Sequence, residues 1–195
     1  IDWDTANERS FLRGRVSTTY YSQKQTDGAI PFSDENDPVY ITSNTAEFDH
    51  GLETAAYAGN ARGWQGKNYV RGEKFLVDQK KGQFYAEGSV QSLLYRAKQV
   101  EGNGETSVPV YAAADRMLYA RDNRLLRYES NVDIRQGTDR ISSAIANVFL
   151  DERYEVSQTV AETNVIITQP NRRAAGDYAQ YIAADQSVIL RGSPA

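Results

Sequence analysis

The stretch ADRMLYARDNRLLRYESNVDIRQG, from Ala114 to Gly137, repeats an upstream stretch, AEFDHGLETAAYAGNARGWQG, from Ala46 to Gly66. When the two are aligned on their Gln-Gly pairs, three further positions coincide: Tyr119 with Phe48, Tyr128 with Tyr57, and Asn131 with Asn60. Internal similarity of this kind is typical of proteins built from stacked repeats. We therefore expect the chain to form one structural unit several times over.

The repeat recurs along the chain as a small or turn-forming pair of residues followed by an alternating apolar run. The pairs are Gly14-Arg15, Gly59-Asn60, Gly88-Ser89, Ser130-Asn131, Thr163-Asn164 and Gly192-Ser193. Asn60 and Ser89 lie 29 residues apart, so the unit has about 30 residues. Two longer intervals contain polar, Gly- or Pro-bearing stretches at 24–37 and 98–106, which are expected to be loop-like insertions.

Short alternating runs rich in Tyr, Val, Ile and Phe predict β-strands throughout the chain. Residues 139–150 also fit a short helix, but their place in the repeat favours a strand. The connections are short and rich in Asp, Asn and Gly, which favours two facing antiparallel sheets over a parallel solenoid. The sequence thus predicts one elongated all-β domain over residues 1–195.

Composition excludes several classes of site. The 195 residues include 40% hydrophobic and 25% charged residues, as in an ordinary folded protein, and the net charge of −4 argues against a nucleic-acid binder. The absence of cysteine excludes disulfides and thiolate chemistry. The single histidine, His50, cannot form a multi-histidine metal site and is expected to be a plain turn residue. No cofactor or metal is expected.

The sequence contains no run of about 18 apolar residues that would span a membrane, and no signal peptide. It begins with Ile1 rather than Met, so it is expected to be a processed or truncated piece of a longer protein.

Alternation along each strand places one set of side chains on a single, dry face of the sheet. The apolar residues expected to line this interior are Tyr57, Phe84, Ala86, Val90, Leu126, Tyr128, Val132, Ile134, Val148, Val165, Ile167, Val188 and Leu190. The charged residues between them should face water; they are Arg127, Glu129, Asp133 and Arg135. A packed β-sandwich core would give the same pattern as an open apolar slot. Small inner residues favour the slot; they are Ala55, Ala61, Gly63, Ala86 and Ala146.

Several phrases of the repeat together resemble the OstA-like, or LptA/LptC-type, β-jellyroll family of lipopolysaccharide transport. They are GNARGWQGKNYVRGEKFLVD (59–78), AEGSVQSLLY (86–95), ESNVDIRQGTDRISSAIANVFLD (129–151) and GDYAQYIAADQSVILRGSPA (176–195). The chain departs from the family pattern after Gly66, where Lys-Asn-Tyr-Val-Arg-Gly-Glu lacks the usual Ala-Asp. The family subtype therefore stays open among a soluble shuttle, an anchored member and a domain linked to an outer-membrane barrel.

The resemblance implies a folded-over antiparallel jellyroll that is not an enzyme and that binds the acyl chains of lipid A in an apolar groove. It also implies a periplasmic location, with or without a membrane anchor. The partners that it implies are lipopolysaccharide and other jellyroll domains, including further copies of the chain, joined by end-to-end strand pairing.

Two other classes remain as alternatives. A carbohydrate-active enzyme needs two facing carboxylates, but the carboxylates here fall in turns or on the wet face, and catalytic motifs such as Gly-x-Ser-x-Gly are absent. A structural or adhesive β-repeat module would have a similar sequence but an interior filled by its own large side chains. The pair Arg172-Arg173 is expected to be solvated in a turn, or else to contact lipid phosphates at the mouth of the slot.

Overall fold

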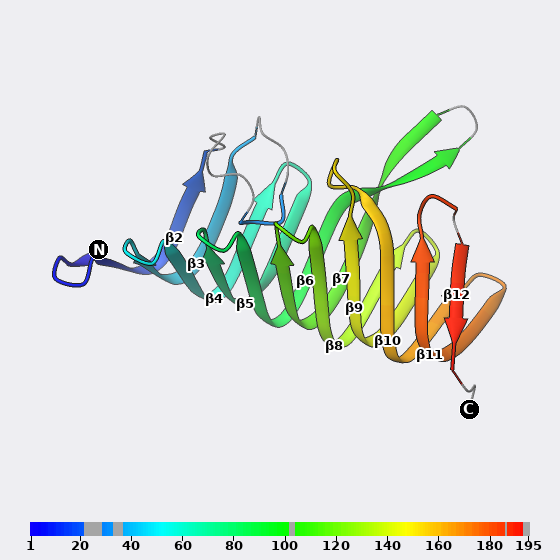
Figure 1. Cartoon of the computed structure of the whole chain (residues 1–195). Coiled ribbons are helices and arrows are strands. Elements are labelled where there is room, and N and C mark those ends of the chain that lie inside the picture. The colour runs from blue at the N-terminus through cyan, green and yellow to red at the C-terminus, as the bar shows by residue number, and fades with distance from the viewer. Residues whose placement is uncertain (22–28, 33–36, 102–103, 186, 193–195) are drawn as a thin grey trace.

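The structure, a computed structural model, describes residues 1–21, 29–32, 37–101, 104–185 and 187–192, and the side chains of all of these except 95–101 and 104–108. The described residues form twelve strands (Figure 1): β1 Asp2–Asp4, β2 Arg9–Tyr20, β3 Val39–Asp49, β4 Thr54–Gln65, β5 Asn68–Asp78, β6 Gln83–Glu101, β7 Gly104–Ala120, β8 Leu125–Gln136, β9 Asp139–Leu150, β10 Val156–Gln169, β11 Arg172–Ile182 and β12 Ser187–Arg191. Within this part of the chain no helix has the length and apolar character needed to cross a bilayer.

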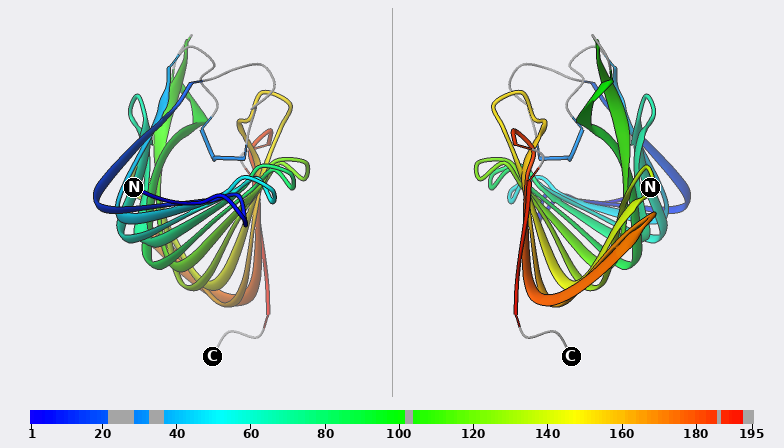
Figure 2. Two further views of the ribbon diagram at one scale, coloured as in Figure 1. Left: turned by 90° about the vertical axis from the view of Figure 1, so that its left-hand side faces the viewer. Right: turned by 90° about the vertical axis from the view of Figure 1, so that its right-hand side faces the viewer.

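Each strand pairs antiparallel with the next one along the chain, so the order in the sheet is simply β1 to β12. The all-β, antiparallel prediction is confirmed, and the ambiguous stretch Asp139–Leu150 is a strand. The end-on views in Figure 2 show that the sheet is folded along its length into a trough. The two facing sheets that the sequence predicted are the two halves of one continuous sheet, because a long strand runs down one wall and up the other.

The fold of the sheet coincides with a bulge in the middle of each long even-numbered strand from β2 to β10. At the bulge, two consecutive residues have positive φ; the pairs are Gly14-Arg15, Gly59-Asn60, Gly88-Ser89, Ser130-Asn131 and Thr163-Asn164. In β4, for example, Gly59 and Asn60 together face the single residue Glu73 of β5. An extra residue bends a strand and increases its local twist. Five of the six recurring pairs in the sequence are therefore corners of the trough, and Ser193 of the sixth lies outside the described residues.

The bulges divide the trough into two walls. The first wall contains the strand segments next to the turns at 49–54, 78–83, 120–125, 150–156 and 182–187, and those turns form the first rim. The second wall contains the segments on the other side of the bulges, and the second rim is formed by the turns at 65–68, 136–139 and 169–172.

The repeated Gln-Gly pairs lie on the second rim. Gly66 and Gly137 have φ of 55° and 57°. Two-residue hairpin turns need positive φ, and glycine adopts it most readily. Gln65 is buried, and its Nε2 donates a 2.6 Å hydrogen bond to the backbone oxygen of Asp37. The glycine thus makes the turn at the rim while the glutamine fixes the chain that approaches it.

The predicted insertions are only partly loops. The one at 98–106 extends a hairpin, since β6 continues to Glu101 and β7 begins at Gly104, with a second register shift between Leu94 and Ala97. This hairpin rises above the rims of the trough (Figure 1). The insertion at 24–37, predicted to be polar, contains the buried segment Ala29–Phe32, and much of the rest lies outside the described residues.

The bulges can be tested at Asn60, which is exposed and has φ of 52°. The variant Asn60→Val should lose about 1–2 kcal/mol of unfolding free energy, because a β-branched side chain is strained in this region of φ. The matched variant Asn60→Gly should stay within about 0.5 kcal/mol of the parent, because glycine adopts positive φ freely. Urea unfolding followed by circular dichroism measures both, and equal stability of the two variants would contradict the assignment.

Candidate functional site

Most of the predicted interior is buried between the walls. The predicted residues that are nine per cent exposed or less are Tyr57, Phe84, Ala86, Val90, Leu126, Tyr128, Val132, Ile134, Val148, Val165 and Ile167. Leu190 is half-buried and Val188 is 49% exposed. Both lie on the inner phase, since they pair with Ala179 and Tyr181 of β11. They are exposed because no described strand continues the sheet beyond β12.

Several of the most buried inner residues did not figure in the prediction. They are Ile41, Val70, Phe75, Val77, Met117 and Tyr119. Tyr119 had a signal, because it coincides with Phe48 in the repeat alignment. The sequence signal for strand β5 was weaker. Its inner residues Val70 and Phe75 are five positions apart, on either side of the residue that faces the bulge of β4. Such a shift breaks the period-2 pattern from which a face is read.

Tyrosine hydroxyls join the two walls across the interior. The hydroxyl of Tyr57, on the first wall, lies 2.6 Å from that of Tyr20 and 3.0 Å from Oγ1 of Thr18, both on the second wall. Burial raises the pKa of both phenols, so they stay protonated and available as hydrogen-bond donors. A second link lies four strands further on, where the hydroxyl of Tyr128 is 2.9 Å from Oγ of Ser92.

These hydrogen bonds fix the distance between the two walls. The partners come from opposite sides of their bulges, so each hydrogen bond spans the trough rather than running along one wall. A buried hydroxyl without a partner is costly, so the two pairings oppose separation of the walls. The interior from β2 to β9 is consequently one packed cluster of apolar residues.

The packing changes towards the C-terminal end. There Ala161, Val165, Ile167 and Ala179 form a separate small cluster, with Leu190 packed against it. Arg172 and Arg173 lie on the second rim beside this cluster, and both are exposed. Nε of Arg172 donates a hydrogen bond to Oε1 of Gln169. The trough therefore ends in a partly exposed apolar surface, and two exposed arginines lie on the neighbouring rim.

The charged residues between the inner ones lie on the outer face, as predicted, and pair with one another. Arg127 donates to Glu129 at 2.6 Å. Asp133 accepts hydrogen bonds from Arg135 at 2.6 Å and from Arg140 at 2.7 Å. Burial opposes ionisation of Asp133, but the two guanidinium groups outweigh it and lower the pKa of this carboxyl.

The outer face of the first wall carries a concavity of about 730 Å³. Its outward-facing lining includes Ala56, Leu76, Tyr85 and Leu118, bordered by ion pairs such as Lys74–Glu87, whose nitrogen and oxygen lie 2.9 Å apart. The other charged groups of the lining are also paired, since Arg116 and Arg127 both contact Glu129.

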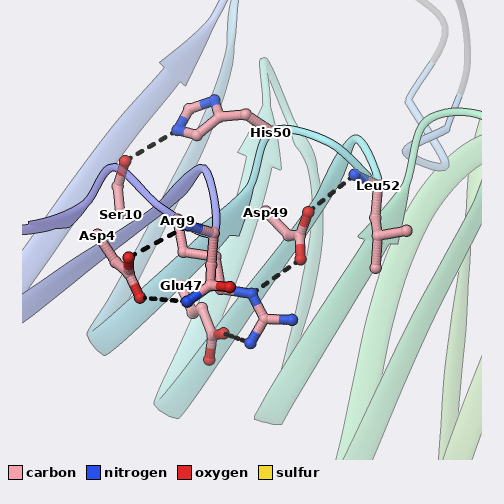
Figure 3. Close-up of polar contacts among 8 residues, drawn as sticks. Asp4, Arg9, Ser10, Glu47, Asp49, His50 and Leu52 are labelled. Atoms are coloured by element: carbon pink, nitrogen blue, oxygen red, sulfur yellow. Dashed lines mark hydrogen bonds and ion pairs between the residues drawn. The ribbon is translucent and has the colours of Figure 1, made fainter.

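The N-terminal end of the first rim is fixed by polar contacts (Figure 3). Nε of Arg9 donates to Asp49 at 2.9 Å, and the other oxygen of Asp49 accepts from the backbone nitrogen of Leu52 at 2.8 Å. The backbone hydrogen bond from Leu52, aided by Arg9, lowers the pKa of Asp49. His50 is a turn residue, as predicted, and its Nε2 lies 2.8 Å from Oγ of Ser10. In the described part of the chain, no three His, Asp or Glu side chains are grouped so as to hold a metal ion.

The link between the walls can be tested by a double-mutant cycle on Ser92 and Tyr128. We expect Tyr128→Phe and Ser92→Ala each to lower the unfolding free energy by about 1–2 kcal/mol, with a coupling of about 1 kcal/mol, because each removes a partner of a buried hydroxyl. The control is Tyr85→Phe, whose exposed hydroxyl donates to Gln83 on the same strand and should cost less than about 0.5 kcal/mol. Zero coupling in urea unfolding would show that the walls are held by other contacts.

Comparison with known proteins bears on the C-terminal part of the chain. Residues 111–195 match the family model described as LptA/(LptD N-terminal domain) LPS transport protein. No protein with a curated description matches the chain in sequence. A similar solved structure is that of LptH, the LptA homologous periplasmic component of the conserved lipopolysaccharide transport device from Pseudomonas aeruginosa. It is 14% identical, the match covers 80% of this chain and 96% of that chain, and the TM-score is 0.48.

The matched family consists of transport proteins rather than enzymes, and the match supports a role in lipopolysaccharide transport. The resemblance that the repeated phrases indicate is thereby confirmed. Residues 111–195, from β7 to the C-terminus, are thus similar to the LptA/LptD N-terminal-domain family of lipopolysaccharide transport proteins, and the matched part is less than half of the chain.

Proposed function

We propose that this protein is a non-catalytic carrier that binds the lipid A acyl chains of lipopolysaccharide inside the trough and passes them across the periplasm to the outer membrane. The observation that carries the proposal is the apolar inner face of one folded sheet, which has a large cluster from β2 to β9 and a smaller one from β10 to β12. The family match over residues 111–195 supplies the kind of ligand.

Burial of acyl methylenes supplies enough free energy for reversible carriage. Each buried methylene contributes about 0.8 kcal/mol, so a chain that inserts only part of its length gains several kcal/mol before ordering costs. The ligand site on this proposal is the predicted interior, and it begins at the C-terminal end, where Val188 and Leu190 present apolar surface that no described strand covers. Arg172 and Arg173 on the neighbouring rim suit the lipid phosphates.

The two ends of the sheet suit end-to-end association. β1 pairs only with Arg9–Phe11 of β2, and β12 pairs only with Tyr178–Ile182 of β11. On the second wall, residues 16–20 of β2 and 172–176 of β11 consequently pair with only one neighbouring strand within the described chain. Such edges recruit strands of another chain through main-chain hydrogen bonds. The partner is a second copy of this chain or another jellyroll domain, which would lengthen the trough.

The lipid proposal is tested by photo-crosslinking at two adjacent residues of β12. Val188 lies on the inner phase with 49% exposure, whereas Ile189 lies on the outer phase with 38% exposure. A photoreactive phenylalanine at Val188 should yield adducts with lipopolysaccharide, and the same group at Ile189 should yield few or none. Mass spectrometry of the irradiated protein identifies the adducts.

The same experiment at Tyr128 and Val132, with Arg127 and Asp133 as controls from the outer phase, reports whether lipid reaches the packed middle of the trough. Equal adducts on both phases would indicate unspecific contact. Absence of adducts at all inner positions of a folded sample would refute carriage. It would favour a structural β-repeat module, for which the packed interior from β2 to β9 is the supporting observation.

The association proposal is tested with a photoreactive group on Thr19, an exposed residue on the unpaired half of β2. Irradiation should give crosslinked dimers whose yield rises with protein concentration. Leu76 is the matched control, because it is 39% exposed but lies on the outer face in the middle of the sheet. Crosslinking of equal yield from Leu76, or none from Thr19 at high concentration, would rule out the β2 edge as the contact.

A further inference from the structure

The connection between β2 and β3 places an apolar segment inside the trough. Ala29, Ile30 and Phe32 are each 6–8% exposed, and Pro31 is among the most completely buried residues. All three non-proline residues belong to the main apolar cluster. Figure 2 shows the segment crossing between the two walls on the side of the rims. We call Ala29–Phe32 the clip.

The clip has a defined local structure. The backbone nitrogen of Phe32 donates a 2.8 Å hydrogen bond to the backbone oxygen of Ile30, two residues earlier. This is a γ-turn centred on Pro31, whose ring restricts φ to values near those of the inverse γ-turn. The turn holds Ile30 and Phe32 on either side of a rigid residue, so both side chains are presented together.

Phe32 occupies space that the strands leave empty. A Cβ added to Gly63 would lie 3.6 Å from Cε2 of Phe32, 3.6 Å from Cε2 of Phe75 and 3.7 Å from Cγ1 of Ile41. Gly63 and Ile41 belong to the second wall and Phe75 to the first, so the ring of Phe32 lies over the inner face near both walls. A small inner residue here does leave a slot, and the clip fills it.

We propose that the clip is a built-in occupant of the acyl-chain site, which an incoming acyl chain displaces. The inference rests on the proposed function. Ile30, Pro31 and Phe32 are apolar and buried, as an inserted acyl chain would be, and Ile30 and Phe32 belong to the cluster of the same inner face. Clip and ligand therefore exclude each other at the N-terminal half of the trough, whereas the apolar surface around Val188 stays open.

Mutual exclusion has a definite consequence for affinity. If the ligand enters fully only when the clip has left, the observed dissociation constant equals the intrinsic one divided by the fraction of molecules in which the clip has left. A chain with a weakened clip should consequently bind acyl chains more tightly. A clip that is only part of the packed core predicts the opposite, since its loss would damage the site.

The first experiment compares binding of a dansyl-labelled fatty acid to the parent chain and to the double variant Ile30→Ser/Phe32→Ser. We expect the variant to bind roughly threefold to tenfold more tightly. Leu52→Ser, at an exposed turn of the first rim, is the control and should leave the affinity unchanged. Equal or weaker binding by a double variant with a native circular dichroism spectrum would overturn the proposal.

The second experiment keeps the clip intact and does not depend on the variant folding. Phe32 is replaced by para-fluorophenylalanine, and its fluorine NMR signal is followed while the same fatty acid is added. We expect the signal to move to a solvent-exposed position as the ligand binds. Saturation of binding with the signal unmoved would overturn the clip proposal while leaving the carrier proposal intact. Failure of the fatty acid to bind at all, with no lipopolysaccharide adduct at Val188, would refute both.

Discussion

The structure depends on a backbone constraint: two consecutive residues with positive φ in the middle of each long even-numbered strand from β2 to β10. Without these bulges, a sheet of twelve antiparallel strands would be an open twisted layer with two solvated faces. With them, every long strand contributes to both walls, and the inner face of one half packs against the inner face of the other. The same corner recurs with Gly-Arg, Gly-Asn, Gly-Ser, Ser-Asn and Thr-Asn, so the backbone geometry is kept while the side chains vary.

The corners explain why the repeat is visible in sequence, and also where the sequence misleads. Pairs such as Gly59-Asn60 were readable because few residues tolerate positive φ, and the Gln-Gly pairs were readable because a tight rim turn needs glycine at Gly66 and Gly137. Period-2 alternation then placed Tyr57, Tyr128 and Val132 correctly on the inner face. The same bulges shift the phase, which is why the inner residues of β5 escaped notice.

Other features had no local signal in the sequence. The links from Tyr57 to Thr18 and from Tyr128 to Ser92 join residues 39 and 36 positions apart, and neither serine nor threonine is distinctive in a strand. The clip was hidden because the sequence on either side of it is rich in polar residues, and local composition does not reveal that Gly63 leaves room for Phe32. The single sheet was equally hidden, since two separate facing sheets would require the same alternation. The hairpin extension at 98–106 looked like a loop because its residues are polar.

Packing differs along the trough: one part stabilises the fold, and the other presents apolar surface. From β2 to β9 the walls are held at a fixed distance by hydroxyl pairs and by a filled interior, which stabilises the fold in the absence of any ligand. Towards β12 the inner residues form a smaller cluster and are partly exposed, so apolar surface is presented there without first breaking the core. Most contacts in the array join neighbouring strands, so a separation of the walls passes from one strand pair to the next. An acyl chain that enters at the C-terminal end would thus meet the weaker packing first and the hydroxyl links later. The free-energy cost of separating the walls therefore rises along the trough towards the clip.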